Sequence, residues 1–113
     1  MIVGIGVDIL KISRMKLEHA KRVLSEEEFI IFNEFKLESR KLEYLAGRFA
    51  AKEAIIKAIG NTKYIVGMRD IAILNDDNGL PYVKKPVYDD IRIMISLSHE
   101  KDNSIGMCVI ENV

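Results

Sequence analysis

One long helical stretch constrains the fold of this sequence more than any other feature. Residues 39–60 follow a helical pattern that starts near Ser39 and ends at Gly60, and glycine is the residue that most often follows the end of a helix. A helix of this length spans about 30 Å, roughly the width of a small domain. In a chain of 113 residues it would form the spine, and we expect residues 1–113 to fold around it as a single domain.

The other segments predict shorter elements. Ser25 and Glu28 form a capping box, which is a typical start of a helix, and the residues after them predict a short one. Alternating apolar and polar residues bounded by turn residues predict strands. The predicted elements are strands at 2–10, 65–74 and 80–83, a turn at 75–79, a hairpin of 91–98 with 105–111, and a helix at 11–22.

The first predicted strand has an unusual face. Gly4, Gly6 and Asp8 alternate with larger apolar residues, so they lie on the same side of the strand. Two glycines leave that side bare, which would let a ligand or another backbone come close. The alternative is a solvent-exposed edge strand whose Asp8 only faces water.

The long helix carries a carboxylate within its predicted apolar face. A helical wheel places Glu53 within about 40° of three residues of this face, which consists of Leu42, Ala46, Phe49 and Ile56. A carboxylate that loses its water without a cationic partner costs several kcal/mol. Glu53 therefore needs a cation, and Lys57, one turn further along, would supply one through an ordinary ion pair.

A metal ion is the other cation that would satisfy Glu53. Magnesium prefers oxygen ligands and is typically held by one or two carboxylates together with water and phosphate oxygens. Asp8 is the natural second ligand, because a central helix would pack against its strand. Lys52 and Lys57 would then be free to hold phosphate charge. The residues alone leave both readings open, a structural ion pair or a phosphate-handling Mg²⁺ site.

Charge and composition exclude several classes of function. Seventeen Lys and Arg balance seventeen Asp and Glu, so no overall charge draws the chain to nucleic acid or to an acidic membrane. The one cysteine, Cys108, can form no internal disulfide, and its apolar neighbours predict a buried strand. No segment has the roughly 20 apolar residues that cross a bilayer, and residues 1–10 lack the features of a signal peptide. We therefore expect a cytoplasmic protein.

Two further segments carry polar groups in unusual numbers. Residues 11–22 contain five basic residues, among them Arg14, Lys21 and Arg22, and one acidic residue. Such a run is most often a solvated face, and a binding surface is the alternative. Two hydroxyls and the imidazole of His99 end the strand predicted at 91–98, where they would contact a phosphate or adenine, or form only a polar strand end.

Two segments together resemble one enzyme family. They are residues 6–14, which read GVDILKISR, and residues 48–60, which read RFAAKEAIIKAIG. These are similar to the two signature motifs of the 4′-phosphopantetheinyl transferases, specifically the small holo-acyl-carrier-protein synthases. The segments 78–81, NGLP, and 96–99, SLSH, agree as well. The resemblance therefore runs in order along the whole chain.

The resemblance implies a fold, an assembly and a reaction. The implied fold is α+β, with a small, mainly antiparallel sheet packed on a long central helix, and the implied assembly is a homotrimer with active sites between neighbouring subunits. The implied reaction moves the 4′-phosphopantetheine group from coenzyme A to a serine of apo acyl carrier protein and releases adenosine 3′,5′-bisphosphate. It would depend on Mg²⁺ as cofactor and support fatty acid biosynthesis.

The family's functional residues carry over to matching positions in this sequence. Asp8 and Glu53 match its Mg²⁺ ligands, and Lys57 matches a lysine that contacts the phosphates, which makes these three the implied catalytic residues. Positions implied to bind coenzyme A, besides Lys57, are Arg48, Gly60, Asn78, Gly79, Pro81 and His99. Positions implied to bind the acidic carrier protein are Arg14, Lys21 and Arg22. The nucleophilic serine would belong to the partner, and the general base is either Glu53 or a water molecule held by it on the metal.

The sequence departs from the family pattern at two places and leaves two rival functions. Leu80 stands where a basic residue often precedes the proline, and residues 61–63, NTK, replace a glycine-rich continuation, which affects the implied nucleotide contacts. A metal-dependent phosphodiesterase would use the same carboxylates and lysines, with water as its nucleophile. A non-catalytic coenzyme A binding module would keep Glu53 paired with Lys57.

Overall fold

The computed structural model describes residues 1–113 and contains two sheets and three α-helices. The larger sheet consists of β1 (Ile2–Lys11), β4 (Ile91–His99) and β5 (Asn103–Asn112), and the smaller one of β2 (Ala72–Asn75) and β3 (Pro81–Lys85). The helices are α1 (Ala20–Val23), α2 (Glu26–Glu34) and α3 (Glu38–Ile59), with 3-10 turns at Ile12–Arg14, Leu17–His19 and Met68–Asp70. The predicted α+β class is confirmed.

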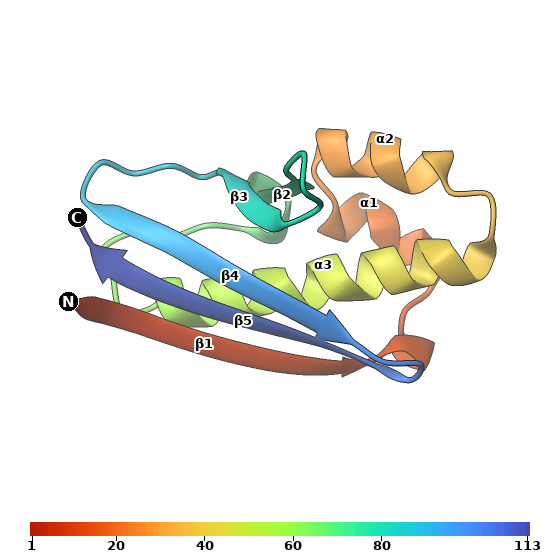
Figure 1. The fold of residues 1–113 in the computed structure, drawn as a ribbon, viewed down its shortest axis with the longest axis horizontal. Coiled ribbons are helices and arrows are strands. Elements are labelled where there is room, and N and C mark those ends of the chain that lie inside the picture. The colour runs from red at the N-terminus through yellow and green to blue at the C-terminus, as the bar shows by residue number, and fades with distance from the viewer.

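The larger sheet is antiparallel throughout and places both chain termini at one end. Its strand order is β1-β5-β4, so β5 is the central strand and pairs with both neighbours. The backbone N–H of Asn112 donates to the carbonyl of Met1 over 3.0 Å, and Figure 1 shows the two termini side by side. The predicted hairpin of β4 and β5 is confirmed.

Helix α3 lies directly on this sheet because glycines remove the side chains between them. A Cβ atom added to Gly6 of β1 would lie 2.1 Å from the carbonyl oxygen of Ala54, and one added to Gly106 of β5 would lie 2.5 Å from backbone atoms of Ala51. Gly4 meets the same helix one turn further along. The prediction that the glycine face admits another backbone is confirmed, and that backbone is α3.

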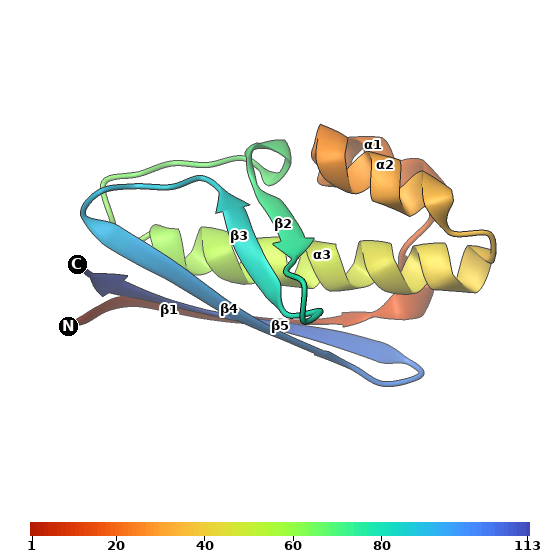
Figure 2. The same ribbon diagram turned by 45° about the horizontal axis from the view of Figure 1, so that its top comes forward.

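The core forms two clusters on either side of α3. One lies between the C-terminal half of α3, the larger sheet and β2, and it includes Ile55, Cys108 and Ile110. The other lies under α1 and α2, which cover the N-terminal half of α3 on the side away from the sheet (Figure 2). Burial raises the pKa of the Cys108 thiol to about 12, as expected for a buried strand residue. No helix in the structure is both long enough and apolar enough to cross a bilayer.

The helix predicted at residues 11–22 is wrong. Lys11 belongs to β1, two 3-10 turns follow, and only Ala20–Val23 is α-helical. Ile12 and Met15 are buried but Leu17 is exposed, so the segment has no continuous apolar stripe that would hold a helix against the core. The backbone N–H of Ile12 instead donates to the carbonyl of Asp102 over 2.9 Å, which ties the segment to the turn between β4 and β5.

The strand predicted at residues 65–74 is too long. Only its last part pairs, as β2, and the chain before it makes a 3-10 turn at Met68–Asp70. The carboxylate of Asp70 accepts a hydrogen bond of 2.9 Å from the backbone N–H of Gly67, which holds this turn closed. A side chain that bonds to its own backbone in this way competes with strand pairing.

The face of the larger sheet turned away from α3 is apolar and uncovered. Ile5, Val7 and Ile9 of β1 are 63%, 59% and 64% exposed, and Ile105 and Met107 of β5 continue the same face. We call these five residues the open sheet face. Contiguous apolar surface of this kind is typical of a protein interface.

Candidate active site

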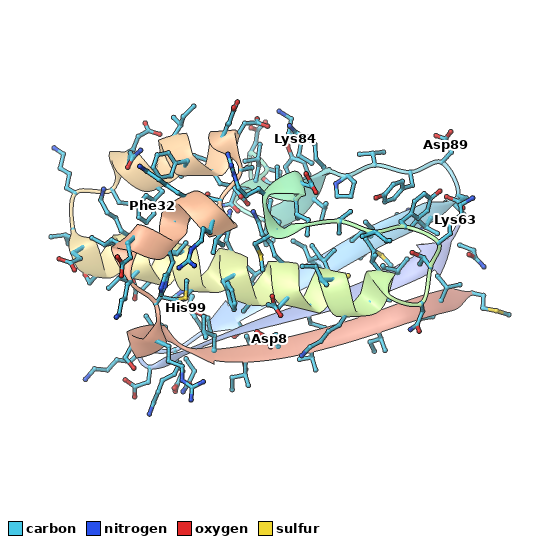
Figure 3. The ribbon with its side chains drawn as sticks, turned by 180° about the vertical axis from the view of Figure 1, so that it is seen from behind. Asp8, Phe32, Lys63, Lys84, Asp89 and His99 are labelled. Atoms are coloured by element: carbon cyan, nitrogen blue, oxygen red, sulfur yellow. The ribbon has the colours of Figure 1, made fainter.

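Asp8 and Lys57 meet at the contact between β1 and α3. The Nζ atom of Lys57 donates to the carbonyl of Val7 over 3.0 Å and lies 3.4 Å from Oδ1 of Asp8. Figure 3 shows Asp8 on β1 where the strand runs alongside α3. The side chain of Asp8 is 20% exposed and that of Lys57 is 54% exposed, so solvent reaches this pair.

Glu53 does not lie in a buried apolar face, and that prediction is wrong. Its side chain is half-buried, like those of Leu42, Phe49 and Ile56, and it makes no hydrogen bond or ion pair. Where α3 meets the glycines of the sheet its buried residues are alanines, such as Ala54 and Ala58, because the glycines bring the helix backbone too close for larger side chains. The alternative ion pair between Glu53 and Lys57 does not form either, since Lys57 turns to Asp8.

Glu53 nevertheless lies one helical turn from Lys57. Residues four apart lie on the same face of a helix, so Glu53 is one turn from Lys57, on the face that reaches Asp8. The structure therefore brings Asp8 and Lys57 into contact and places an unpaired carboxylate one helical turn away.

Lys52 cannot hold phosphate, and that prediction is wrong as well. Its side chain is completely buried, and Nζ donates to Oε1 of Glu28 over 2.5 Å and to the carbonyl of Val23 over 2.7 Å. Burial lowers the pKa of Lys52, while the charge and hydrogen bond of Glu28 oppose this. Lys52 points away from the site, toward α1 and α2.

The donor set of the site fits a magnesium ion. Two carboxylates, Asp8 and Glu53, would supply hard oxygen ligands, and no three or more His, Cys, Asp or Glu side chains lie together so that they could hold a metal ion by themselves. A site with two protein carboxylates leaves several coordination positions for water and substrate phosphate, which suits Mg²⁺ better than an all-protein cage.

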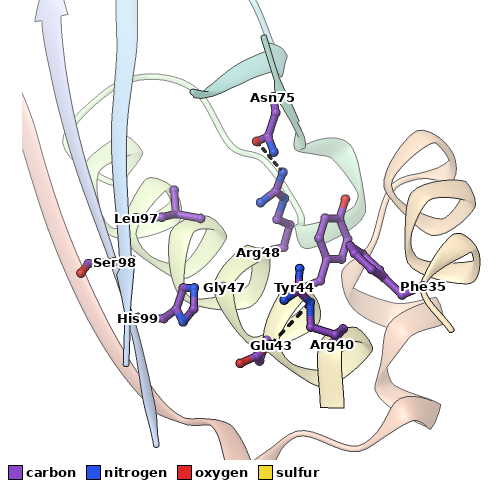
Figure 4. A pocket seen from close by; sticks show the side chains of 10 residues that line it. All are labelled: Phe35, Arg40, Glu43, Tyr44, Gly47, Arg48, Asn75, Leu97, Ser98 and His99. Carbon is purple, nitrogen blue, oxygen red and sulfur yellow. Dashed lines mark hydrogen bonds and ion pairs between the residues drawn. The ribbon is translucent and has the colours of Figure 1, made fainter. Parts of the chain in front are cut away.

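A polar pocket of about 330 Å³ lies beside the N-terminal half of α3 (Figure 4). Arg48 donates from Nη2 to Oδ1 of Asn75 over 3.1 Å, and its guanidinium lies 4.5 Å from the ring centroid of Tyr44. The pocket is lined by Phe35, Arg40, Glu43, Tyr44, Gly47, Arg48, Asn75, Leu97, Ser98 and His99. The structure thus brings together Arg48 and His99, which are far apart in the sequence.

Two residues that line this pocket each have a buried polar atom without a hydrogen-bond partner. These atoms are the hydroxyl of Tyr44 and Nε of Arg48. Burial raises the pKa of Tyr44 to about 12, with a smaller opposing effect from the charge of Arg48, so the hydroxyl keeps its proton and remains a donor. The basic side chains of Arg40 and Arg48, together with His99, favour an anionic ligand such as a phosphate in this pocket.

The remaining positions assigned to coenzyme A lie outside this pocket. Gly60 caps α3 with a right-handed backbone, so this position does not require glycine for its backbone angles. Asn78, Gly79 and Pro81 lie in and after the tight turn that joins β2 to β3, where Gly79 has a positive φ of 83°. None of these four residues lines the pocket that contains Arg48.

The basic residues of the first segment surround a second pocket. Arg14 and Arg22 line a cavity of about 430 Å³ whose other residues include Leu10, Met15 and Phe49. Lys21 is exposed and lines a smaller neighbouring pocket. This surface combines positive charge with an apolar floor.

Sequence reasoning missed Tyr44 and Asn75, which hold Arg48 in place. Tyr44 lies four residues before Arg48, and Arg40 four residues before Tyr44, so the spacing of one helix face already grouped them. Asn75 gave no local signal, because its partner is 27 residues away in the sequence.

Comparison with known proteins gives a consistent result. Residues 4–109 match the model of a family described as the 4′-phosphopantetheinyl transferase superfamily. A holo-(acyl-carrier-protein) synthase of Geobacillus sp. (strain WCH70) is 46% identical over 100% of this chain and 99% of its own, and one of Oceanobacillus iheyensis is 40% identical over 98% of both.

Solved structures agree with the sequence comparison. A crystal structure of a holo-(acyl-carrier-protein) synthase from Bacillus anthracis, in complex with CoA (3′,5′-ADP), matches with a TM-score of 0.88 and 37% identity over 100% of this chain and 99% of that one. A synthase from Neisseria meningitidis matches with a TM-score of 0.81 and 32% identity over 98% and 99%.

Proposed function

Because the chain belongs to the 4′-phosphopantetheinyl transferase superfamily, among the holo-(acyl-carrier-protein) synthases, we propose that it transfers the 4′-phosphopantetheine arm of coenzyme A to a serine of an apo acyl carrier protein. The serine oxygen bonds to phosphorus, the pyrophosphate bond breaks, and adenosine 3′,5′-bisphosphate leaves. The observation that supports the proposal most is that Asp8, Glu53 and Lys57 lie on adjoining elements, β1 and α3. The chain is also similar to a synthase whose structure was solved with coenzyme A. A cytoplasmic role in fatty acid biosynthesis is part of the proposal.

The proposed cofactor is Mg²⁺, held by Asp8 and Glu53. When bound there, it would neutralise charge on the pyrophosphate of coenzyme A. Glu53 has no protein partner to give up, so its carboxylate is available without cost to the fold. It is also a candidate general base for the serine proton of the carrier protein.

Lys57 has two roles in this proposal. In the free chain its ammonium group neutralises Asp8. A cation bound to Asp8 would replace that ammonium, and Lys57 would turn to the substrate phosphates. Arg48 and His99, which line one pocket, would hold further phosphate groups of coenzyme A.

Intact-mass spectrometry tests the reaction directly. The purified chain is incubated with coenzyme A, Mg²⁺ and an apo acyl carrier protein, and we expect the carrier protein to gain roughly 340 Da, the mass of the phosphopantetheine group. Release of adenosine 3′,5′-bisphosphate without a carrier protein would instead indicate the phosphodiesterase. Binding of coenzyme A without either product would indicate a binding module.

The basic surface around Arg14 is proposed to bind the carrier protein. Complementary charge at the rim of an interface mainly speeds encounter and sets orientation. We expect Arg14→Glu to raise KM for the apo carrier protein about tenfold, and to leave KM for coenzyme A within about twofold, because the pocket of Arg48 is lined by other residues. Steady-state kinetics with each substrate varied in turn checks this. Lys85→Glu is the matched control, since Lys85 is also exposed but lies on β3.

The proposed assembly is a homotrimer with active sites between subunits. The open sheet face supplies an apolar surface that needs a partner. The turn that contains Asn78 and Gly79 does not reach the pocket of its own chain, so its proposed contact with coenzyme A requires the pocket of a neighbouring subunit. A cleft between subunits would also give so small a chain a walled site.

A charge on the open sheet face tests the assembly. We expect Val7→Glu to convert trimers to monomers in light scattering and to lower transfer activity at least tenfold, because a buried unpaired charge is not tolerated in an apolar interface. Val87→Glu is the control, since Val87 is 78% exposed and lies outside this sheet. A trimeric, active Val7→Glu protein would mean that subunits meet elsewhere.

A further inference from the structure

The structure contains one fully buried ion pair, and it lies next to the proposed catalytic carboxylate in the sequence. The side chains of Lys52 and Glu28 are both 0% exposed, and Lys52 immediately precedes Glu53 on α3. No part of the proposed reaction uses either residue.

Glu28 is the junction of four segments. Its Oε1 accepts hydrogen bonds from the backbone N–H of Ser25 over 2.8 Å and from Nζ of Lys52 over 2.5 Å, while its Oε2 accepts one from the backbone N–H of Ile73 over 2.8 Å. Lys52 in turn donates to the carbonyl of Val23. The pair therefore ties α3 to the end of α1, the start of α2 and strand β2.

An ion pair is not needed here for stability. Removing two charges from water costs several kcal/mol, and replacing a buried pair with apolar residues of similar volume is often neutral or stabilising. What directional hydrogen bonds add to apolar packing is a preferred direction for the groups that they join.

Toward the larger sheet, α3 makes no side-chain hydrogen bonds except those of Lys57, which belongs to the proposed site itself. There the helix rests on Gly4, Gly6 and Gly106 through contacts of small residues. These contacts set the distance between helix and sheet, but they are van der Waals contacts without direction, so they resist rotation of the helix about its axis only weakly. Catalytic groups must be held within about 0.5 Å and 10–20° of their productive geometry, and a misplacement of about 1 Å can cost about 10²-fold in rate.

We propose that Lys52 and Glu28 are positioning residues that fix the rotation of α3 about its axis, and thereby the direction in which Glu53 and Lys57 face Asp8. The inference rests on the proposed function of those three residues. Lys52 and Glu53 are neighbours in α3 but point in different directions. In this proposal the core holds Lys52 in place, and the helix thereby holds Glu53 toward the substrate.

The test separates positioning from stability. The variant Lys52→Met with Glu28→Gln removes both charges, nearly conserves both volumes and keeps an amide oxygen for the N–H of Ser25. At a temperature at least 20 °C below its Tm, we expect kcat to fall about 10²-fold, KM for coenzyme A to stay within about twofold, and the Mg²⁺ concentration for half-maximal rate to rise several-fold. Calorimetry with Mg²⁺ and coenzyme A, without carrier protein, should show the same weakening of Mg²⁺ binding.

Two further variants complete the experiment. Glu28→Asp keeps the charge but is too short to serve all three of its donors, so it should lower kcat in a protein that still folds even if the double variant does not. Glu27→Gln is the matched control, since Glu27 is on the same helix and its pair with Lys84 is exposed; its kcat should be unchanged.

The possible outcomes are distinct. Variants that melt earlier but keep kcat and Mg²⁺ dependence within twofold of the parent chain would show that the pair is only structural, and would overturn the inference. A parent chain that transfers nothing to any carrier protein would contradict the proposed function instead, and the calorimetric comparison would still test the positioning of Glu53.

Discussion

Replacing Glu53 with glutamine is expected to abolish most transfer activity while leaving the fold intact. A positioned acid or base and the charge that it holds typically contribute about 10²–10⁴-fold to a rate, and we expect a loss of about 10³-fold in kcat. The fold should be unaffected because Glu53 is half-buried and has no hydrogen bond or ion pair to lose. Intact-mass kinetics and a thermal melt of the same preparation check both parts.

Replacing Asp8, the other proposed Mg²⁺ ligand, should have a similar effect on activity but a small additional effect on stability. Asp8→Asn should lose as much kcat as Glu53→Gln, but it also removes the contact with Lys57. Ion pairs exposed to solvent contribute about 0–1 kcal/mol, so the Tm should fall by only a few degrees. Glu38→Gln, at an exposed position of α3, is the control for the loss of one negative charge. If Glu53→Gln keeps its rate and its dependence on Mg²⁺, the proposed metal site does not exist.

Adding one methyl group at Gly106 is expected to lower the stability of the fold strongly. Its Cβ would lie 2.5 Å from the backbone of Ala50 and Ala51, and backbone cannot rotate aside as a side chain can. Overpacking typically costs about 1–3 kcal/mol, and we expect Gly106→Ala near the upper limit, which corresponds to a fall in Tm of about 10 °C. Because Gly106 pairs with Asp8 in the sheet, the variant should also lose activity below its Tm.

A second glycine provides the control for this substitution. Gly47 lies within α3, and a Cβ there would make only an ordinary contact of 3.7 Å with Leu97. Alanine is a better helix residue than glycine by about 0.5–1 kcal/mol, so Gly47→Ala should raise the Tm by a few degrees. If the Tm falls for Gly106→Ala and rises for Gly47→Ala, the contacts of the added methyl group determine the change in stability, and the loss of a glycine as such does not. Equal melting of Gly106→Ala and the parent chain would mean that α3 does not lie against β5.

Local patterns in the sequence predicted several parts of this molecule correctly. The capping box of Ser25 and Glu28 was recognisable because its two partners are three residues apart. The bare face of β1 was recognisable because Gly4 and Gly6 alternate with large residues. In both cases the deciding interaction, or the absence of a side chain, lies within a few positions of the chain.

Other features depend on residues that are distant in the sequence. Lys52 was predicted to hold phosphate because nothing near it indicated Glu28, which is 24 residues earlier. The core face of α3 was misassigned because a wheel gives weight to large apolar residues such as Phe49. Where a helix lies directly against glycines of a strand, only small residues fit between the two backbones, so residues such as Ala54 are the buried ones. The glycines of β1 and the alanines of α3 would have to be considered together to predict this.

The strand order of the larger sheet has a consequence for how the chain acquires its structure during synthesis. β1 is made first, yet it pairs only with β5, whose residues 103–112 are made almost last. At about 5–20 residues per second, β1 must wait several seconds or longer for its partner, with its apolar side chains unpaired. Pairings between distant segments also slow folding itself. A ribosome-bound chain that stops before residue 103 would therefore contain both Asp8 and Lys57, but β1 would lack the strand that pairs it into the sheet.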